Sequence, residues 1–493
     1  MLDTAIVGAG FAGLGMGMAL REAGRSDIAV LERGADVGGT WRDNTYPGVA
    51  CDVPSHLYGF ARRPNPGWSG VYAEGAEIQD YLRRAAAGLA PQLRLRTPLL
   101  GATWAGAAWR LETGGPDPGV TWARSLVLAC GRLTEPRIPA IRGLETFAGP
   151  MFHTARWDHS TPLAGTRVAV VGTGASAVQL VPELVRRGAR VTLFQRTPAW
   201  IVPREGRRYT DAERHLFATR PDELAALRDQ LYLEGEERYA SRSGDAEAAA
   251  AAEAVARAHL AAQVADPDLR RALTPDYAFG CKRVLLSDDF YPALSSGAVT
   301  FEPSALSAVE AGELVAASGA RYRADVLVLA TGFASSQQPY ADLVRGEHGT
   351  LAEHWSGGMT SYASTVVAGF PNLFVLNGPN ASLGHNSSVL MAEAQAEYVV
   401  RALALRDERG GVLRVRPDAE KTYTARIDEA AASTPWIAGG CENWYTDERS
   451  GRLTLLWPGT VDAFRAMLRG SRGDEFDTGS NRPRDPSRTR GEP

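Results

Sequence analysis

The sequence predicts an α/β fold in which one βαβ architecture occurs twice. Two glycine-rich turns, Gly8–Gly13 and Gly172–Ala177, each follow a short apolar strand and precede a run of small residues typical of a helix. The segment Leu126–Gly131 is echoed by Leu327–Gly332, and each closes the unit that its glycine turn opens. A strand, a glycine turn and a helix in this order are the elements of a doubly wound sheet. We therefore expect two Rossmann-like domains.

The first glycine turn has the residues needed to bind a dinucleotide. Gly8, Gly10 and Gly13 form a GxGxxG pattern, which allows a tight turn, close backbone approach to a pyrophosphate, and packing of helix against strand. The next strand ends in Glu32, 24 residues after Gly8, where a carboxylate accepts hydrogen bonds from ribose hydroxyls. A glycine-rich turn followed by a surface glutamate is the alternative interpretation.

The second glycine turn differs from the first in the charge that follows it. Gly172 and Gly174 are followed by Ala177 in the third place of the motif, and Arg196 stands 24 residues after Gly172. An acid suits a free ribose 2′-hydroxyl, whereas a guanidinium suits a 2′-phosphate. The two units are therefore predicted to bind different dinucleotides, FAD in the first and NADPH in the second. The strands flanking the two turns are expected at 4–7, 28–31, 167–171 and 190–194.

The order of these segments predicts the domain organisation. Residues 1–140 form the first part of the FAD-binding domain, and 333–469 form its second part. The NADP-binding domain spans 150–332, with a helical insertion at about 209–277 that is rich in Ala, Glu, Arg and Leu. The insertion either shapes the substrate cavity or only packs against the domains. Residues 470–493 carry almost no apolar side chains and are expected to be disordered.

Composition excludes several classes of protein. The 53 Lys and Arg residues nearly balance the 57 Asp and Glu residues, which argues against a nucleic-acid binder or a polybasic membrane surface. The apolar first twenty residues lack a basic start and are interrupted by glycines, so we expect no signal peptide and no membrane span. The four cysteines form no CxxC pair, so a disulfide framework, a metal site and a dithiol redox centre are not expected. A reducing cytoplasm is the simplest setting.

Two further motifs resemble the fingerprints of type I Baeyer–Villiger monooxygenases, which are class B flavoprotein monooxygenases. The first combines Phe147, Gly149, His153, Trp157 and Asp158 just before the second glycine turn. The second, within residues 38–52, consists of Gly39, Trp41, Tyr46, Pro47, Gly48 and Asp52. The resemblance covers nearly the whole chain and is greatest to the branch that includes 4-hydroxyacetophenone monooxygenase. The chain departs from the pattern at Arg42 and Asp43, where aromatic residues are common, and at 357–364.

The resemblance implies an activity and its central residues. In this family NADPH reduces FAD, O2 adds at the C4a carbon, and the resulting peroxyflavin inserts one oxygen atom beside a carbonyl, which converts a ketone to an ester or lactone. The family assigns stabilisation of the anionic peroxide to a cation, here Arg283, and its orientation to an acid, here Asp52. An arginine suits this role because it does not lose its proton and therefore cannot quench the peroxide. A purely structural ion pair is the alternative.

The resemblance also assigns cofactor and linker residues. On the FAD side it adds Thr40, Trp41 and Tyr58. On the NADP side Thr197 and Lys282 join Arg196 at the 2′-phosphate, and Trp444 lies near the nicotinamide. His153 and Trp157 are expected to couple the two domains rather than to act as acid or base. The alternatives are a solvated lysine for Lys282, a core tryptophan for Trp444 and a structural histidine for His153.

Three other functions compete with this interpretation. Oxygenation of sulfur or nitrogen, as in the related flavin-containing monooxygenases, keeps the same cofactors, but Trp157-Asp158 favours the Baeyer–Villiger fingerprint. A disulfide reductase is disfavoured because CxxC is missing. A non-catalytic redox sensor has no need of a cation such as Arg283. The predicted partners are a small carbonyl substrate and O2; the ketone and the oligomeric state are not predicted.

Overall fold

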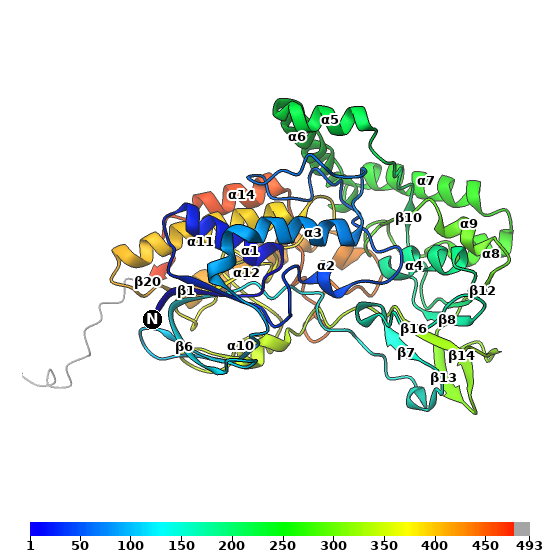
Figure 1. Ribbon diagram of the computed structural model, residues 1–493, viewed down its shortest axis with the longest axis horizontal. Helices are drawn as coiled ribbons and strands as arrows, with labels where there is room; N and C mark the ends of the chain where they lie inside the picture. Colours follow the sequence, from blue (N-terminus) through cyan, green and yellow to red (C-terminus); the bar gives the residue numbers. More distant parts are fainter. Residues whose placement is uncertain (478–493) are drawn as a thin grey trace, which may run out of the picture.

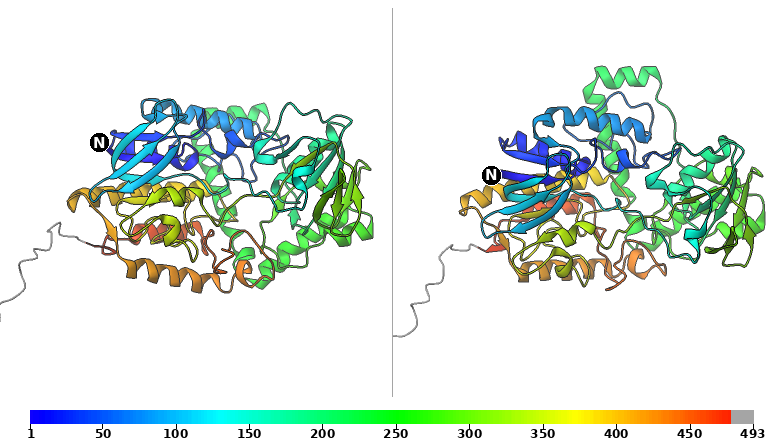
Figure 2. Two further views of the ribbon diagram at one scale, coloured as in Figure 1. Left: turned by 90° about the horizontal axis from the view of Figure 1, so that it is seen from below. Right: turned by 60° about the horizontal axis from the view of Figure 1, so that its bottom comes forward.

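The two glycine-rich turns lie in two separate sheets, which define two lobes of the molecule (Figure 1). The structure is a computed structural model that describes residues 1–477. In Figure 1 the first lobe contains the blue, cyan and yellow-to-red segments, and the second lobe contains most of the green ones. Two further views show the lobes standing side by side (Figure 2).

The first lobe is built on an eight-stranded mixed sheet. Its strands are β1 (Leu2–Val7), β2 (Ile28–Leu31), β3 (Leu93–Arg94), β4 (Leu99–Trp104), β5 (Trp109–Thr113), β6 (Gly119–Leu128), β17 (Val344–Arg345) and β18 (Leu373–Val375). The order is β17-β4-β5-β6-β1-β2-β3, and β18 also pairs with β6. β1 runs parallel to both β2 and β6, and β2 is buried at every position, which explains its continuous apolar sequence.

Helices cover this sheet and come from both ends of the chain. They are α1 (Phe11–Glu22), α2 (Thr40–Asp43), α3 (Gly75–Ala86), α10 (Leu351–His354), α11 (Ser388–Glu408), α12 (Pro417–Ala431), α13 (Pro435–Ala438) and α14 (Val461–Gly470), with 3₁₀ turns η1 (Ala87–Gln92) and η5 (Pro339–Leu343). α1, which follows the first glycine turn, packs against α11. The helix after the first glycine turn is therefore covered by a helix that lies almost 400 residues later in the sequence.

The second lobe contains a five-stranded parallel sheet of order β12-β9-β8-β16-β7. Its strands are β7 (Met151–His153), β8 (Arg167–Val171), β9 (Arg190–Phe194), β12 (Val299–Glu302) and β16 (Val326–Leu329). The remaining elements are α4 (Ala175–Arg186), α9 (Phe290–Leu294), η2 (Leu144–Thr146), η3 (Thr154–Arg156), the pair β10 (Ile201–Val202) and β11 (Leu285–Leu286), and the antiparallel strands β13 (Leu306–Glu310), β14 (Glu313–Ala316) and β15 (Arg321–Tyr322). β8 and β9 have the bounds expected from the sequence.

The helical insertion bridges the two lobes. It consists of α5 (Asp211–Thr219), α6 (Pro221–Glu237), η4 (Ala240–Arg242), α7 (Ala246–Gln263) and α8 (Pro267–Leu273). α7 and α8 lie on the second lobe, whereas α6 lies over the first (Figure 1). The guanidinium of Arg228 on α6 donates to the carbonyls of His56 and Gly59, at 2.8 and 3.0 Å. The insertion is therefore a strap between the lobes as well as part of the second one.

Two expectations from the sequence are wrong. Cys281 and Cys441 form a disulfide, with their Cα atoms 6.2 Å apart, although they lie 160 residues apart in the sequence. The absence of CxxC could not exclude it, because loops of the two lobes bring the cysteines together. Disorder from Gly470 onward is also wrong for residues 470–477. There β20 (Phe476–Asp477) pairs with β19 (Arg414–Val415), and Phe476 is buried. Residues 478–493 lie outside the described part of the chain.

Within residues 1–477 no helix is long and apolar enough to cross a membrane. The same residues contain no cluster of three or more His, Cys, Asp or Glu side chains arranged to hold a metal ion.

One buried arginine fixes the first lobe from within. Arg406 on α11 is fully buried, and its guanidinium bonds to the Asp3 carboxylate, to Ser125 Oγ at 2.8 Å and to Asp407 Oδ1 at 2.7 Å. These partners belong to or border β1, β6 and α11. The arginine therefore joins the central strands to the helix that packs on α1.

We predict that Arg406→Ala lowers the free energy of unfolding by about 2–3 kcal/mol, because it removes a fully buried side chain and its bonds to Asp3, Ser125 and Asp407, although Arg25 still pairs with Asp3. Chemical denaturation measures the loss. Arg401→Ala, on the exposed face of the same helix, is the matched control and should cost at most about 1 kcal/mol. Equal stability of the two variants would contradict the structural role given to Arg406.

Candidate active site

The site is centred on an ion pair between the lobes. Arg283 donates from Nε and Nη2 to Oδ2 of Asp52, at 3.0 and 2.5 Å. Asp52 follows a segment of the first lobe in which the Cys51 amide bonds to the carbonyl of Ala73. Arg283 precedes β11, whose pairing with β10 fixes the backbone of the second lobe there. The pair therefore forms only where the two lobes meet.

Both side chains of this pair are partly buried, with 33% of Arg283 and 26% of Asp52 exposed. The carboxylate raises the pKa of Arg283 above its already high normal value. Burial opposes ionisation of Asp52, but the charge and hydrogen bonds of Arg283 outweigh burial and lower the pKa of Asp52. Both groups are therefore charged at any physiological pH, and Arg283 is a permanent cation.

Aromatic side chains surround the pair from both sides. Trp41 Nε1 donates to the hydroxyl of Tyr58 at 3.2 Å, and both rings belong to the first lobe. Tyr445 is buried on the other side, and burial raises its pKa to about 12, so its hydroxyl is neutral. Trp444 is half-buried, and its ring centroid lies 4.4 Å from that of Tyr445. Tyr58 and Tyr445 lie close enough to feel the charge of Arg283, whereas Trp41 packs on the first ring and Trp444 on the second.

The first glycine turn has the geometry of a phosphate seat. A Cβ at Gly8 would lie 2.4 Å from the carbonyl of Ala129, and one at Gly13 would lie 1.8 Å from the carbonyl of Gly8, so both glycines serve the fold. A Cβ at Gly10 would meet no atom closer than Gly39 Cα at 3.8 Å. Gly10 precedes α1, whose first amides receive no side-chain cap. Free amides and open space at a helix N-terminus are what a pyrophosphate requires.

Glu32 is buried and held in place beside this turn. The amide of Ala9 donates to its Oε2 at 2.9 Å, and the amide of Gly34 donates to its Oε1 at 2.7 Å. Arg42 also donates to Oε1 at 2.7 Å, a contact that the sequence did not indicate. A carboxylate has four acceptor positions, so Glu32 retains capacity for ribose hydroxyls. Thr40 begins the short helix α2 on the exposed side of the same region.

The second glycine turn repeats this arrangement. A Cβ at Gly172 would lie 2.5 Å from the carbonyl of Ala330, whereas one at Gly174 would meet no protein atom within 4 Å. α4 begins after Gly174 without a side-chain cap, and Ala177 is fully buried against the strands. The protein itself would accept a side chain at Gly174. A ligand that approaches the backbone explains the glycine there.

Two cations face each other beyond this turn. Arg196 is exposed and Lys282 is half-buried, and within residues 1–477 neither forms an ion pair. Lys282 Nζ lies 5.0 Å from the ring centroid of Tyr277. Burial, aided by the like charge of Arg196, lowers the pKa of Lys282. Thr197 belongs to the same region, since its carbonyl accepts a hydrogen bond from Thr173 Oγ1 at 3.0 Å. Glu442 and Asp276 act on Lys282 only at longer range, so two like charges that form no ion pair within residues 1–477 suit an anionic ligand.

His153 and Trp157 lie at the end of β7 and just after the 3₁₀ turn that follows it. His153 ends β7, and its Nδ1 accepts a hydrogen bond from the Ala155 amide at 3.1 Å. Burial lowers the pKa of His153 to about 4, so the imidazole is neutral. Trp157 lines two surface hollows of about 300 and 380 Å³ between the lobes, both shared with Thr45 of the first lobe.

The structure adds contacts that sequence reasoning missed. Tyr46 donates to Gln179 Oε1 at 2.8 Å, and Gln179 Nε2 donates to the carbonyl of Ala50 at 2.9 Å, which fastens α4 to the first lobe. Arg204 donates to the carbonyl of Cys51, beside Asp52. No local pattern marks Gln179 or Arg204. The sequence marked Arg42 only as a residue that stands where the family often has an aromatic one.

Comparison with known proteins identifies the family. Residues 5–211 match the family model described as pyridine nucleotide-disulphide oxidoreductase. The chain is 44% identical to a Baeyer–Villiger monooxygenase of Streptomyces coelicolor, over 94% of this chain and 90% of that protein. It is 39% identical to a Baeyer–Villiger monooxygenase of Pseudomonas aeruginosa, over 94% and 89%. The chain belongs to the Baeyer–Villiger monooxygenases.

Solved structures of the family agree with this assignment. A steroid monooxygenase bound to NADP superposes with a TM-score of 0.83 at 28% identity, covering 96% of this chain and 99% of that one. Cyclohexanone monooxygenase from Rhodococcus bound to NADP+ superposes with a TM-score of 0.85 at 25% identity, covering 97% and 98%. The predicted family, the fold of two Rossmann-like domains and the class of flavoprotein monooxygenase are confirmed. Oxygenation of sulfur or nitrogen is not favoured.

We predict that Gly174→Ala leaves thermal stability unchanged but raises the KM for NADPH by roughly tenfold, equivalent to about 1.4 kcal/mol. The added methyl group contacts no protein atom but occupies the space where a pyrophosphate would approach. Steady-state kinetics and thermal unfolding measure the two effects. Gly172→Ala is the contrasting variant. Its Cβ would collide with the Ala330 carbonyl, so it should lose stability as well. An unchanged KM in Gly174→Ala would show that no pyrophosphate lies there.

Proposed function

We propose that this Baeyer–Villiger monooxygenase binds FAD in the first lobe and NADPH in the second, and that it inserts one oxygen atom of O2 beside the carbonyl of a small ketone. FAD, once reduced by NADPH, supplies the activated oxygen. The single observation that carries the proposal is the pair of Asp52 and Arg283, a permanent cation held where the two lobes meet. The proposal includes the domain division at about residues 140, 150 and 333, which is supported by the assignment of the strands to two sheets.

Arg283 suits a reaction in which an oxygen atom must stay anionic until it attacks a carbonyl. Its guanidinium donates hydrogen bonds and holds its proton, since Asp52 raises its pKa further. A fixed cation in a shielded site stabilises developing negative charge without reorganising during the reaction. Asp52 acts as the positioning residue, because both hydrogen bonds reach its Oδ2 and leave Nη1 of the fork without a bond to it.

The remaining predicted residues follow the same division. Gly8, Gly10, Gly13 and Glu32 would hold the pyrophosphate and ribose of FAD, with Thr40, Trp41 and Tyr58 nearer the flavin. Gly172, Gly174 and Ala177 would hold the pyrophosphate of NADPH, with Arg196, Thr197 and Lys282 at its 2′-phosphate and Trp444 near the nicotinamide. His153 and Trp157 would couple the lobes. We also propose a cytoplasmic location, which fits the use of NADPH as the reductant.

We predict that Arg283→Ala separates reduction from oxygenation. FAD binding should persist, because the first glycine turn is untouched, and NADPH should still be oxidised, because Arg196 remains. Ketone oxygenation should fall by about a hundredfold or more, as when a dedicated oxyanion donor is removed. The NADPH consumed should then appear as hydrogen peroxide. The measurement is product formed per NADPH oxidised.

Arg283→Lys is the matched control for charge, and it should not restore coupling fully. An ammonium is a point donor that can itself act as an acid, unlike the guanidinium fork. Near-wild-type coupling in Arg283→Ala on a good ketone substrate would overturn the assignment. Failure of wild-type protein to oxygenate any of a panel of cyclic, linear and aryl ketones would overturn the proposed function.

We predict that NADPH is preferred over NADH and that Arg196→Ala abolishes most of the preference. Loss of one charge-assisted contact to the 2′-phosphate should weaken NADPH binding by about 1.5–3 kcal/mol, roughly ten- to a hundredfold. NADH lacks that phosphate, so its KM should stay nearly constant. Steady-state KM values for both nucleotides in wild type and variant measure the change. Equal use of NADH and NADPH by the wild type would contradict the proposal.

A further inference from the structure

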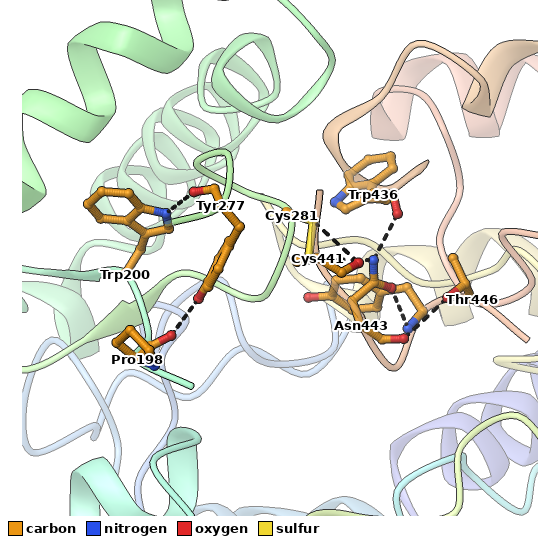
Figure 3. The surroundings of a disulfide bond; sticks show 9 residues. Pro198, Trp200, Tyr277, Cys281, Trp436, Cys441, Asn443 and Thr446 are labelled. Carbon is orange, nitrogen blue, oxygen red and sulfur yellow. Dashed lines mark hydrogen bonds between the residues drawn. A yellow bond between two sulfur atoms is a disulfide. The ribbon is translucent and has the colours of Figure 1, made fainter. Parts of the chain in front are cut away.

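A disulfide joins the two lobes directly beside the active-site cation. Cys281 immediately precedes Lys282 and Arg283, in the loop that leads into β11. Cys441 lies three residues before Trp444, in the loop that follows α13 of the first lobe. Figure 3 shows the two loops approaching from opposite sides, with the sulfur–sulfur bond between them. The cross-link therefore connects the proposed 2′-phosphate and nicotinamide residues of the two lobes.

Little else holds these two loops together. The described chain forms no helix or strand between Leu273 and Leu285, nor between Ala438 and Val461. One backbone hydrogen bond, from the Ala278 amide to the Gly439 carbonyl at 3.0 Å, connects the loops near the disulfide. Asn443 instead bonds within its own segment, donating to the Trp436 carbonyl at 2.8 Å (Figure 3). The disulfide is thus the covalent restraint between the two loops, and it adds to the hydrogen bonds by which Asp52 holds Arg283.

The two sulfur atoms differ in access and surroundings. Cys281 is fully buried, within an apolar cluster that includes Trp200 and Tyr277. Cys441 is partly exposed and packs at the edge of the same cluster. Cys441 is therefore the side from which an external thiolate would attack, with Cys281 as the leaving group. The Cys281 sulfur released in this exchange takes up a proton, because its apolar surroundings disfavour a thiolate.

We propose that Cys281 and Cys441 form a reversible redox site that sets how firmly the Lys282–Arg283 loop is held; the inference rests on the proposed function. Reduction by a dithiol converts the disulfide to two thiols and the dithiol to its own disulfide, with two electrons and two protons transferred. Oxidation by hydrogen peroxide forms the sulfur–sulfur bond and yields two molecules of water. Cys51 and Cys130, the other two cysteines, are not part of the site.

The two redox states should differ in cofactor binding and in coupling. With the disulfide closed, Lys282 and Arg283 keep fixed positions and less conformational entropy is lost when NADPH binds. With the disulfide open, the loop moves more, NADP+ binds more weakly, and more of the consumed NADPH is released as hydrogen peroxide. That peroxide is the oxidant that closes the disulfide again. Uncoupled turnover would therefore restore the coupled state.

The first test establishes the bond itself. Protein purified and alkylated without reductant should yield a cross-linked peptide pair containing Cys281 and Cys441, and only Cys51 and Cys130 should be alkylated. Treatment of the folded enzyme with dithiothreitol should open the bond, and hydrogen peroxide should re-form it. Failure to form the cross-linked peptide even after peroxide treatment would overturn the proposal, whatever the activity.

The second test compares the FAD-loaded enzyme in both redox states. Reduction should weaken NADP+ binding by about three- to tenfold, the loss expected when one or two binding side chains are no longer preorganised. The ratio of product to NADPH oxidised should fall as well. Cys441→Ala should behave like reduced wild type and respond to neither reagent, and its partly exposed position makes it the safer variant to fold. Cys130→Ser keeps the pair and should retain the wild-type response.

The outcomes separate this proposal from the proposed function. If the ketone is oxygenated equally well in both states and NADP+ affinity is unchanged, the redox site is wrong and the function stands. If neither state oxygenates a ketone, but NADP+ affinity still changes with redox state, the function is wrong and the restraint on the loop stands. A redox response that persists in Cys441→Ala would assign the effect to another group.

Discussion

The site depends on one electrostatic contact made across a boundary between two lobes. Arg283 is supplied by the second lobe and Asp52 by the first, and their hydrogen bonds form only when the lobes are packed together. A partly buried guanidinium without its carboxylate would be costly, so each partner stabilises the other in a shielded site. The contacts of Gln179 with Tyr46 and Ala50, and the α6 strap, support the same closed arrangement.

In each glycine turn, neighbouring glycines are needed for different reasons. Gly8, Gly13 and Gly172 are required by the backbone itself, since a Cβ would collide with a carbonyl oxygen. Gly10 and Gly174 face space that the protein leaves open next to uncapped helix termini. The first three glycines are therefore required by the fold, and the other two leave room for a ligand to approach the backbone. In the proposed function, the charges that follow, Glu32 and Arg196, would distinguish the two nucleotides.

Features that depend on neighbouring residues, such as the bounds of short buried strands, were predicted correctly from the sequence. β2, β8 and β9 have the expected bounds, because central parallel strands are short, apolar and bounded by glycine turns or charges. The pairing of Arg283 with Asp52 followed from family motifs, and the structure places them in contact. The family motifs do not predict the contact of Gln179 with Tyr46, because it joins segments that lie 133 residues apart. They do not predict the salt bridge between Arg42 and Glu32 either, because it depends on how the irregular turn between β2 and α2 folds back.

The disulfide and the C-terminal strand were missed for a related reason. Cysteine spacing reports pairs that are near in sequence, whereas Cys281 and Cys441 are brought together by two irregular loops. The polar composition after Gly470 outweighed a single apolar residue, yet burial of Phe476 and pairing of β20 with β19 are enough to order the stretch up to Asp477.

The most direct test of the central contact is a double-mutant cycle on Asp52→Asn, Arg283→Gln and the double variant, with ketone product per NADPH oxidised as the readout. If Asp52 acts only by positioning Arg283, the double variant should be no worse than Arg283→Gln alone, with an interaction energy of about 1–3 kcal/mol. Effects of the two substitutions that simply add would contradict the account, since they would give Asp52 a role independent of the cation.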